Sequence, residues 1–335
     1  MSINLAINGF GRIGRTFLRT IMQDAQARLK LNVVTINVGP TPPINLDLLF
    51  QYDSIMGTYN GTVTFHDNQL IIDGHAITVV SESNPEALPW KKLNIDWVIE
   101  SSGHFTNREQ AQRHPLPQQG KILITAPSAD ADITIIPGVN DQAYNVAQHR
   151  LVSLGSCTTN CFAPLVKVIK ENVTLLQGMM TTAHAYTANQ NVLDNQHKDP
   201  RRARSAASNM IPAATGAQKV IAKIFPDLEG KVLATGLRIP LPIVSLVDFT
   251  FVTQEKLTIE AINELFKSAA TSSLKNILAY NEKQLVSSDF IGNTHSAIFD
   301  SPLTQSIGTM HKIFAWYDNE FGYSSRLKDF LLHNS

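Results

Sequence analysis

The sequence predicts an α/β protein of two domains: first a doubly wound, mostly parallel sheet, then an α+β domain with a mainly antiparallel sheet. Three observations support this prediction. The chain has 335 residues, of which 43% are hydrophobic, and this is enough for two cores. Over the first 155 residues, short apolar runs alternate with helix-like or turn-rich segments, as is typical of parallel sheets. After residue 161 the strand-like runs become longer, as expected of antiparallel strands.

The strands of the first sheet are expected at the short apolar runs, which are residues 3–7, 31–36, 97–99, 122–124, 133–136 and 150–154. The strands of the second sheet are expected at residues 178–188, 232–239, 244–252 and 307–316, with helices around 211–225 and 259–273 on one side. A last amphipathic helix, over 320–332, is expected to return to the first domain. We therefore expect residues 1–156 and 319–335 to form the first domain and residues 157–318 the second.

A glycine-rich loop follows the first expected strand. The sequence GFGRIG contains Gly9, Gly11 and Gly14, and a helical pattern follows it. Gly9 would permit the tight turn, Gly11 would let a pyrophosphate approach the backbone, and Gly14 would let the helix pack on the strand. The pattern predicts a Rossmann-type dinucleotide site with phosphates at the helix N-terminus, the alternative being a glycine turn made only for packing. Small polar residues also end two expected strands, at 101–103 and 125–128, where such folds place ligands.

The second expected strand does not end in the acidic residue that binds the ribose 2′-hydroxyl of NAD in this pattern. Asn37 and Val38 stand there, and the next carboxylate is Asp47. The 2′-phosphate of NADP would meet no charge repulsion at position 38, yet no Arg or Lys lies between 37 and 45 to hold it; Thr41 is the nearest hydroxyl. The cofactor is therefore NAD or NADP. Dual use or an NADP preference is one interpretation, and drift at a tolerant surface position, with Asn37 still holding the adenosine, is the other.

Cys157 is the strongest candidate nucleophile. It stands in SCTTNC, residues 156–161, where an expected strand gives way to an amphipathic helix. Unpaired N–H groups at a helix N-terminus carry partial positive charge, so we expect a lowered pKa for this thiol and a place for a developing oxyanion. Cys161, one turn further and near Phe162, is expected to be a small buried hydrophobe. Two cysteines without a second ligand pair predict neither a metal site nor a disulfide framework.

His184 is the best candidate for a general base. It stands in TTAHAYT, residues 181–187, and Thr187 follows it. Four cations crowd into KDPRRAR, residues 198–204, which could be a solvated face or a clamp for phosphate through the forked guanidinium groups. Thr215, Gly216 and Arg238 offer further anion ligands. A structural histidine in a strand is the alternative interpretation of His184.

Charge and hydropathy exclude several classes of function. The 28 basic and 28 acidic residues give a formal net charge of zero, so no global field recruits nucleic acid or an anionic membrane. No apolar stretch is long enough to span a bilayer, and residues 1–5 lead into a strand without a basic, cleavable leader. We expect a cytoplasmic protein in a reducing compartment, with no membrane partner and with nucleic acid not its main partner.

Six segments together resemble the phosphorylating glyceraldehyde-3-phosphate dehydrogenase family: residues 9–15, 156–161, 184–187, 197–204, 212–217 and 316–323. The resemblance runs collinearly through the whole chain, and the cysteine motif is very specific to that family and its near relatives. It implies a Rossmann domain plus an antiparallel catalytic domain, assembled as a homotetramer. It also implies the oxidation of D-glyceraldehyde 3-phosphate with inorganic phosphate to 1,3-bisphosphoglycerate.

The resemblance implies a role for each matching residue. Cys157 resembles the family's nucleophile and His184 its general base. The residues that resemble the site of the attacking inorganic phosphate are Ser156, Thr158, Arg202, Thr215 and Gly216, and those that resemble the site of the substrate's own phosphate are Thr187 and Arg238. Besides the three glycines, Asn37 and Val38, the residues that fall where the family contacts the cofactor are Arg12, Ile13, Thr125 and Asn319, the last at the nicotinamide amide.

The implied chemistry is covalent. His184 would take the proton of Cys157, and the thiolate would add to the aldehyde carbon. The hemithioacetal would lose hydride to the nicotinamide, and phosphate would attack the resulting thioester.

Departures from the family concern the cofactor. Members selective for NAD typically have Asp at the position of Val38, and many bacterial members have Leu-Pro where residues 195–196 are Asn-Gln. Both changes resemble members that accept NADP.

The same motifs are compatible with two other functions. Erythrose-4-phosphate dehydrogenase shares the cysteine motif and the mechanism, but residues 185–187 after the histidine resemble the triose enzyme. RNA binding through residues 201–204 would be a secondary role, because zero net charge and the lack of an aromatic-rich basic stripe argue against it as the main function.

Overall fold

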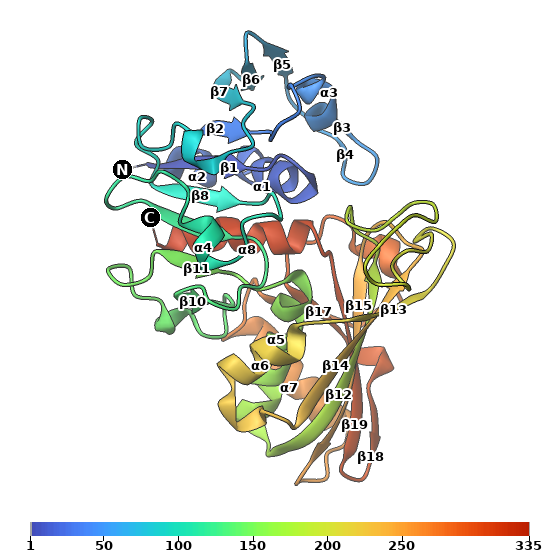
Figure 1. Ribbon diagram of the computed structural model, residues 1–335. Helices are drawn as coiled ribbons and strands as arrows, with labels where there is room; N and C mark the ends of the chain where they lie inside the picture. The colour runs from blue at the N-terminus through green and yellow to red at the C-terminus, as the bar shows by residue number, and fades with distance from the viewer. Residues whose placement is uncertain (1, 335) are drawn as a thin grey trace. The chain divides into compact units, whose positions relative to one another are not determined.

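The computed structural model describes residues 2–334 and divides the chain into two compact units (Figure 1). Unit 1 takes Asp141–Gly155 and the described parts of Met1–Ile135 and Ser324–Ser335; unit 2 takes Ile136–Asn140 and Ser156–Tyr323. This division differs from the expected one at residues 136–140, 156 and 319–323, which belong to unit 2. One reason is that Asn319 is hydrogen-bonded to Ser245 of unit 2.

Unit 1 is built on a sheet in the order β10-β11-β9-β8-β1-β2-β7-β6-β5. Neighbours from β10 to β7 pair in parallel, which confirms the predicted parallel sheet. The bounds are β1 Ile3–Asn8, β2 Leu31–Asn37, β5 Val63–His66, β6 Gln69–Ile72, β7 His75–Val80, β8 Trp97–Glu100, β9 Lys121–Ile124, β10 Ile133–Thr134 and β11 Leu151–Ser153. Strands β5 to β7 were not predicted from the sequence, and their antiparallel pairings extend one edge of the sheet.

The helices of unit 1 are α1 Arg12–Met22, α2 Ala25–Lys30, α3 Leu46–Gln51 and α4 Arg108–Ala111, and a short pair, β3 Tyr52–Asp53 and β4 Gly57–Thr58, follows α3. The last helix, α8 Phe321–His333, begins in unit 2 and continues into unit 1. There, Phe330 packs edge-on against Trp97 of β8 with ring centroids 5.8 Å apart. Contacts of this kind explain why the chain end belongs to the first unit.

Unit 2 contains a mainly antiparallel sheet in the order β13-β14-β12-β15-β19-β17-β16, with β18 paired to β19, as predicted. Two of its pairs, β12 with β14 and β16 with β17, are parallel. The bounds are β12 Leu175–Ala185, β13 Ile211–Ala214, β14 Val232–Ile239, β15 Ser245–Thr253, β16 Leu278–Asn281, β17 Ala297–Asp300, β18 Gln305–Ile307 and β19 Met310–Tyr317. Helices α5 Cys157–Asn172, α6 Ala217–Ile224 and α7 Ile259–Thr271 gather on one side of this sheet (Figure 1). The core between them includes Phe162 and Phe249, with ring centroids 4.8 Å apart.

The helix predicted over residues 211–225 is wrong in its first part. Residues 211–214 form the edge strand β13, and the helix begins only at Ala217. Pro212 has no backbone N–H to donate, and an edge strand tolerates this because one of its sides is unpaired.

Within residues 2–334, no helix is both long and apolar enough to cross a membrane. In the same described part of the chain, no group of three or more His, Cys, Asp or Glu side chains is placed to hold a metal ion.

Candidate active site

Cys157 and His184 meet in unit 2. Cys157 is the first residue of α5, and His184 stands near the end of β12; the Sγ atom lies 3.3 Å from Nε2. The other ring nitrogen, Nδ1, lies 2.7 Å from the carbonyl oxygen of Ala185. Nδ1 also lies 2.8 Å from Arg238 Nη1, which can only donate, so the carbonyl contact and the guanidinium contact require opposite tautomers. Arg238 Nη1 has the Ala185 carbonyl as its own acceptor, so Nδ1–H can donate to that carbonyl and leave the Nε2 lone pair for the thiol. The pair can therefore pass a proton from sulfur to imidazole.

Burial controls the protonation of this pair. It lowers the pKa of His184 to about 3, and the charge of Arg238 acts in the same direction, so the imidazole is neutral. Burial also raises the pKa of the Cys157 thiol, although Arg238 and the backbone N–H of Thr158 lower it. The expected fall in the thiol pKa is therefore wrong for the free protein: the helix N-terminus acts as predicted, but desolvation is the larger effect. The resting pair is a thiol and a neutral base.

Arg238 lies against the histidine because β14 pairs with β12 in a register that puts Arg238 opposite His184. Its Nη1 donates to the carbonyl of Ala185 at 2.9 Å and lies 2.8 Å from Nδ1. Burial lowers the pKa of the Arg238 guanidinium, and the charge of Arg202 acts in the same direction. An anion next to Arg238 would relieve this repulsion.

Tyr317, which the sequence analysis did not single out, holds this site together. Its hydroxyl lies 3.0 Å from Thr158 Oγ1 and 2.8 Å from Thr182 Oγ1, and its ring meets the His184 ring edge-on at 5.9 Å. The signals in the sequence were its place directly after the apolar run 307–316 and within residues 316–323, one of the segments of the family resemblance. The hydroxyl of Thr158, predicted as a phosphate ligand, is buried on Tyr317.

The other predicted phosphate ligands have local partners. Ser156 Oγ accepts from the N–H of Thr159 and caps α5, while Thr215 Oγ1 accepts from the N–H of Ala217 beside Gly216, which caps α6 without a side chain. Thr187 Oγ1 donates to Asn189 Oδ1 at 2.6 Å, and Arg202 lies 3.6 Å from Asp199. Among the described residues, no hydrogen bond joins these groups to Cys157 or His184.

Asn319, predicted at the nicotinamide, is tied to the end of β12. Its Oδ1 accepts from Ser245 Oγ at 3.2 Å, and the same hydroxyl accepts from the N–H of Ala185 at 3.0 Å. Val244, just before Ser245, has a φ of 64°, a left-handed conformation that is strained for a β-branched residue. One strained turn therefore positions the Ser245 hydroxyl, which connects Asn319 to β12, the strand that contains His184.

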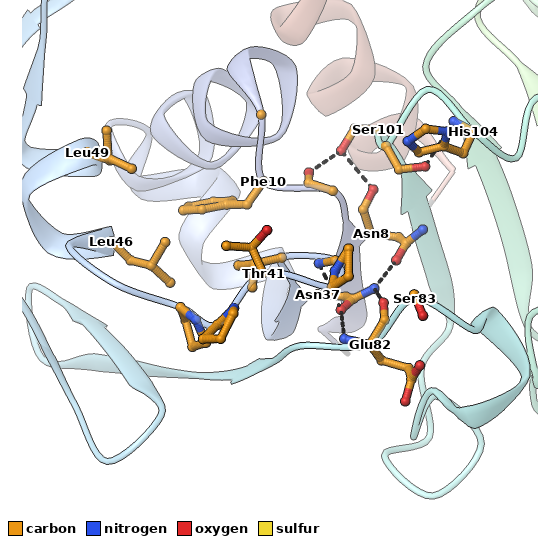
Figure 2. A pocket seen from close by; sticks show the side chains of 18 of the residues that line it. Asn8, Phe10, Asn37, Thr41, Leu46, Leu49, Glu82, Ser83, Ser101 and His104 are labelled. Carbon is orange, nitrogen blue, oxygen red and sulfur yellow. Dashed lines mark hydrogen bonds between the residues drawn. The ribbon is translucent and has the colours of Figure 1, made fainter.

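A separate cavity of about 700 Å³ lies wholly in unit 1 (Figure 2). It is lined by the glycine loop at the end of β1 and by the residues that follow β2, β7 and β8; the lining residues are Asn8–Gly11, Asn37–Ile44, Leu46, Leu49, Glu82, Ser83, Ser101, Ser102, His104 and Phe105. None of these described lining residues is Lys or Arg. Parallel strands present their carboxyl ends at the same edge, and this is where such sheets bind ligands.

The three glycines of the loop fit a dinucleotide. Gly9 has a φ of 97°, and a Cβ on it would come within 2.5 Å of the Ser102 backbone; a Cβ on Gly14 would come within 2.3 Å of the carbonyl of Gly9. Gly11 faces open space and caps α1 without a side-chain hydrogen bond. The first turn of α1 therefore presents N–H groups that no side chain caps, the arrangement that receives phosphate at helix N-termini.

Only some of the remaining predicted cofactor residues line the cavity. Asn37 and Val38 line the cavity. Arg12 pairs with Asp53, and Thr125 Oγ1 donates to the carbonyl of Glu100 at 3.0 Å. Arg12, Ile13 and Thr125 are not among the lining residues.

Glu82, which the sequence analysis did not single out, brings a carboxylate to the cavity from the segment after β7. An acid was expected after β2, whereas Glu82 follows the neighbouring strand β7, which had not been predicted from the sequence.

Comparison with known proteins agrees with this arrangement. Residues 3–108 match the family model described as the NAD binding domain of glyceraldehyde 3-phosphate dehydrogenase, and residues 156–319 match its C-terminal domain. The chain is 44% identical over 331 residues to glyceraldehyde-3-phosphate dehydrogenase 2 of Streptomyces avermitilis, covering 98% of this chain and 97% of the relative. It is 44% identical to glyceraldehyde-3-phosphate dehydrogenase 1 of Bacillus cereus, covering 97% of this chain and 96% of the relative. It is 45% identical to glyceraldehyde-3-phosphate dehydrogenase 2 of Trichormus variabilis, covering 98% of this chain and 97% of the relative.

Proposed function

The chain belongs to the glyceraldehyde-3-phosphate dehydrogenase family, and from this premise we propose that it converts D-glyceraldehyde 3-phosphate and inorganic phosphate to 1,3-bisphosphoglycerate with a nicotinamide cofactor. The observation that carries the proposal is the 3.3 Å approach of Cys157 Sγ to Nε2 of His184. A thiol beside a neutral imidazole is the arrangement that covalent aldehyde oxidation requires.

The reaction begins with proton transfer. His184 Nε2 takes the Cys157 proton as sulfur attacks the aldehyde carbon, and returns it to the former carbonyl oxygen, which completes the hemithioacetal. Nicotinamide, when bound, supplies the chemistry of hydride acceptance from that carbon, and His184 takes the hydroxyl proton. Cys157 then holds the acid as a thioester. A phosphate oxygen attacks the thioester carbonyl, the C–S bond breaks, and the sulfur recovers its proton.

Arg238 and Arg202 supply the positive charge that the phosphates require. In this proposal Arg238 has two partners. Its Nη1 donates to the Ala185 carbonyl, and a bound phosphate would accept from the other N–H groups of the guanidinium. Its charge beside Nδ1 also opposes a lasting imidazolium, so His184 returns its proton readily.

The proposal is tested by phosphate-dependent reduction of NAD by the pure protein with D-glyceraldehyde 3-phosphate. Erythrose 4-phosphate is the comparison substrate. Turnover that requires phosphate and favours the triose supports the proposal; turnover of the tetrose alone, or without phosphate, would contradict it.

We further propose that NAD is used in preference to NADP. The cavity offers no Lys or Arg to hold a 2′-phosphate, and the Glu82 carboxylate at its wall would repel one. Glu82→Gln is expected to raise kcat/KM for NADP relative to NAD by about three- to tenfold, because it removes a repulsion of roughly 1 kcal/mol. Glu86→Gln is the control, since Glu86 is exposed and pairs with Arg113 outside the cavity. An NADP preference in the wild type, unchanged by Glu82→Gln, would contradict this assignment.

The open face of the unit 2 sheet supports the homotetramer. Met179 on β12 is 67% exposed and stands beside Leu233 on β14, which is 50% exposed. Apolar side chains paired on one sheet face are typical of an interface, and we propose a second copy of this chain as the partner.

The double variant Met179→Asp, Leu233→Asp is expected to shift the assembly from four 36.9 kDa chains to a smaller species in light scattering. Charges on this face would have to be desolvated in the interface. The control is Leu29→Asp, at a 73% exposed position of unit 1. A wild type with the mass of one chain would overturn the assignment.

A further inference from the structure

A buried acid–histidine pair in unit 1 takes no part in the chemical steps proposed above. Glu100 ends β8, and His114 follows α4; neither side chain has exposed surface. His114 Nε2 lies 3.1 Å from Glu100 Oε2, and Trp90 Nε1 lies 3.1 Å from His114 Nδ1. Two residues that line the cavity, Asn8 and Ser102, also bond to this carboxylate.

The direction of every hydrogen bond in this cluster follows from one residue. An indole N–H can only donate, so Nδ1 of His114 accepts and the imidazole is neutral with its proton on Nε2. Nε2 therefore donates to Glu100. The carboxylate also accepts from Asn8 Nδ2 at 2.6 Å, from the Ser102 N–H at 2.9 Å and from the Ser102 hydroxyl. Glu100 is thus an acceptor toward four donors.

The donor and acceptor directions set at Glu100 also determine those of the side chains at the cavity wall. Because the Asn8 amide group faces Glu100, its Oδ1 faces Asn37 and accepts from Asn37 Nδ2 at 2.7 Å. Asn37 Nδ2 also donates to the carbonyl of Glu82, and its Oδ1 accepts from the N–H groups of Gly39 at 3.2 Å and Glu82 at 3.0 Å. Figure 2 shows the bonds from Asn8 to Asn37 and from Asn37 to Glu82 along one wall. Each carboxamide has only one orientation that satisfies its neighbours.

We propose that Glu100 and His114 are positioning residues for the dinucleotide, which fix the orientations of Asn8 and Asn37 and so the cavity wall at Gly39 and Glu82. The inference rests on dinucleotide binding in this cavity, as proposed above. An amide in place of the carboxylate would direct N–H groups at N–H groups, and the carboxamides would have to turn. The wall would then have to be restored on binding, at a cost in affinity.

The experiment measures the Kd for NAD by calorimetry, with no substrate present, and the unfolding temperature of the protein without NAD. Glu100→Gln is expected to raise the Kd about tenfold or more, while kcat at saturating NAD changes much less. Asp132→Asn is the matched control. Asp132 also accepts backbone N–H groups in unit 1, from Arg150 at 2.7 Å and Leu151 at 2.8 Å, but does not line the cavity. It is expected to lower the unfolding temperature and leave the Kd unchanged.

A second pair of variants keeps the test decisive if Glu100→Gln does not fold. His114→Gln retains one acceptor for Trp90 and one donor for Glu100, whereas His114→Leu retains neither. His114→Leu is expected to bind NAD several-fold more weakly than His114→Gln.

The inference is overturned if Glu100→Gln binds NAD as the wild type does, if Asp132→Asn weakens binding equally, or if the two His114 variants share one Kd. A wild type that does not bind NAD would instead contradict the proposed function.

Discussion

Cys157→Ser is expected to lose phosphate-dependent oxidation by roughly 10⁴-fold or more. The reason is the weak basicity of His184, the group that would have to deprotonate the serine. Burial holds the pKa of His184 at about 3, so the imidazole is too weak a base to deprotonate an alcohol, although it can assist the more acidic thiol at 3.3 Å. The measurement is steady-state reduction of NAD, together with mass spectrometry of the protein mixed with substrate and NAD in the absence of phosphate.

In that experiment the wild type should gain the mass of one acyl group on Cys157, and the serine variant should gain none. Cys161→Ala is the control, because Cys161 lies buried in the core of unit 2 and Ala costs only about 1 kcal/mol of stability there. It should keep both turnover and acylation. Normal turnover by Cys157→Ser would refute the covalent mechanism.

The parallel sheet could be predicted from the sequence because its central strands are buried on both faces. Strand β8 begins as a continuous apolar run, and the apolar runs of β1 and β2 are interrupted only by Asn4 and by Asn32 and Thr35. The glycine loop after β1 could also be predicted, because its stereochemical requirement shows in the local sequence. The strands β5 to β7 could not be predicted because ten of their 14 residues are exposed or half-buried and their runs are short. Such strands are specified by their pairing more than by their own hydropathy.

In the candidate site, too, features set by local sequence could be predicted, and features set by contacts between distant residues could not. The N-cap of α5, which places Cys157, is local to SCTTNC and could be predicted. Tyr317 lies far from Cys157 along the chain, and it reaches the site only because β19 pairs with β15 and β15 with β12. The pKa of Cys157 was predicted wrongly for a related reason: the helix N-terminus is visible in the sequence, but the desolvation that outweighs it comes from the packed unit.

His184→Asn is expected to lower kcat by about 10²- to 10⁴-fold and to change how the Cys157 reaction depends on pH. In the wild type the imidazole is neutral far below neutral pH, since burial and Arg238 lower its pKa to about 3, and it is therefore ready to take the thiol proton. Without it, attack requires spontaneous ionisation of a thiol whose pKa burial has raised.

The rate at which iodoacetamide alkylates Cys157 measures this difference directly, from about pH 5 to about pH 9. Below the thiol pKa, the His184→Asn rate should rise about tenfold per pH unit, because the thiolate fraction does so. The wild-type rate should be higher at every pH and rise less steeply. His311→Asn is the matched control: burial also lowers the pKa of His311, but this side chain bonds Thr253 and Ser306 away from the site, so its profile should follow the wild type. Equal rates and equal slopes in His184→Asn and the wild type would show that the 3.3 Å contact does not transfer a proton, and the base would then have to be sought elsewhere in unit 2.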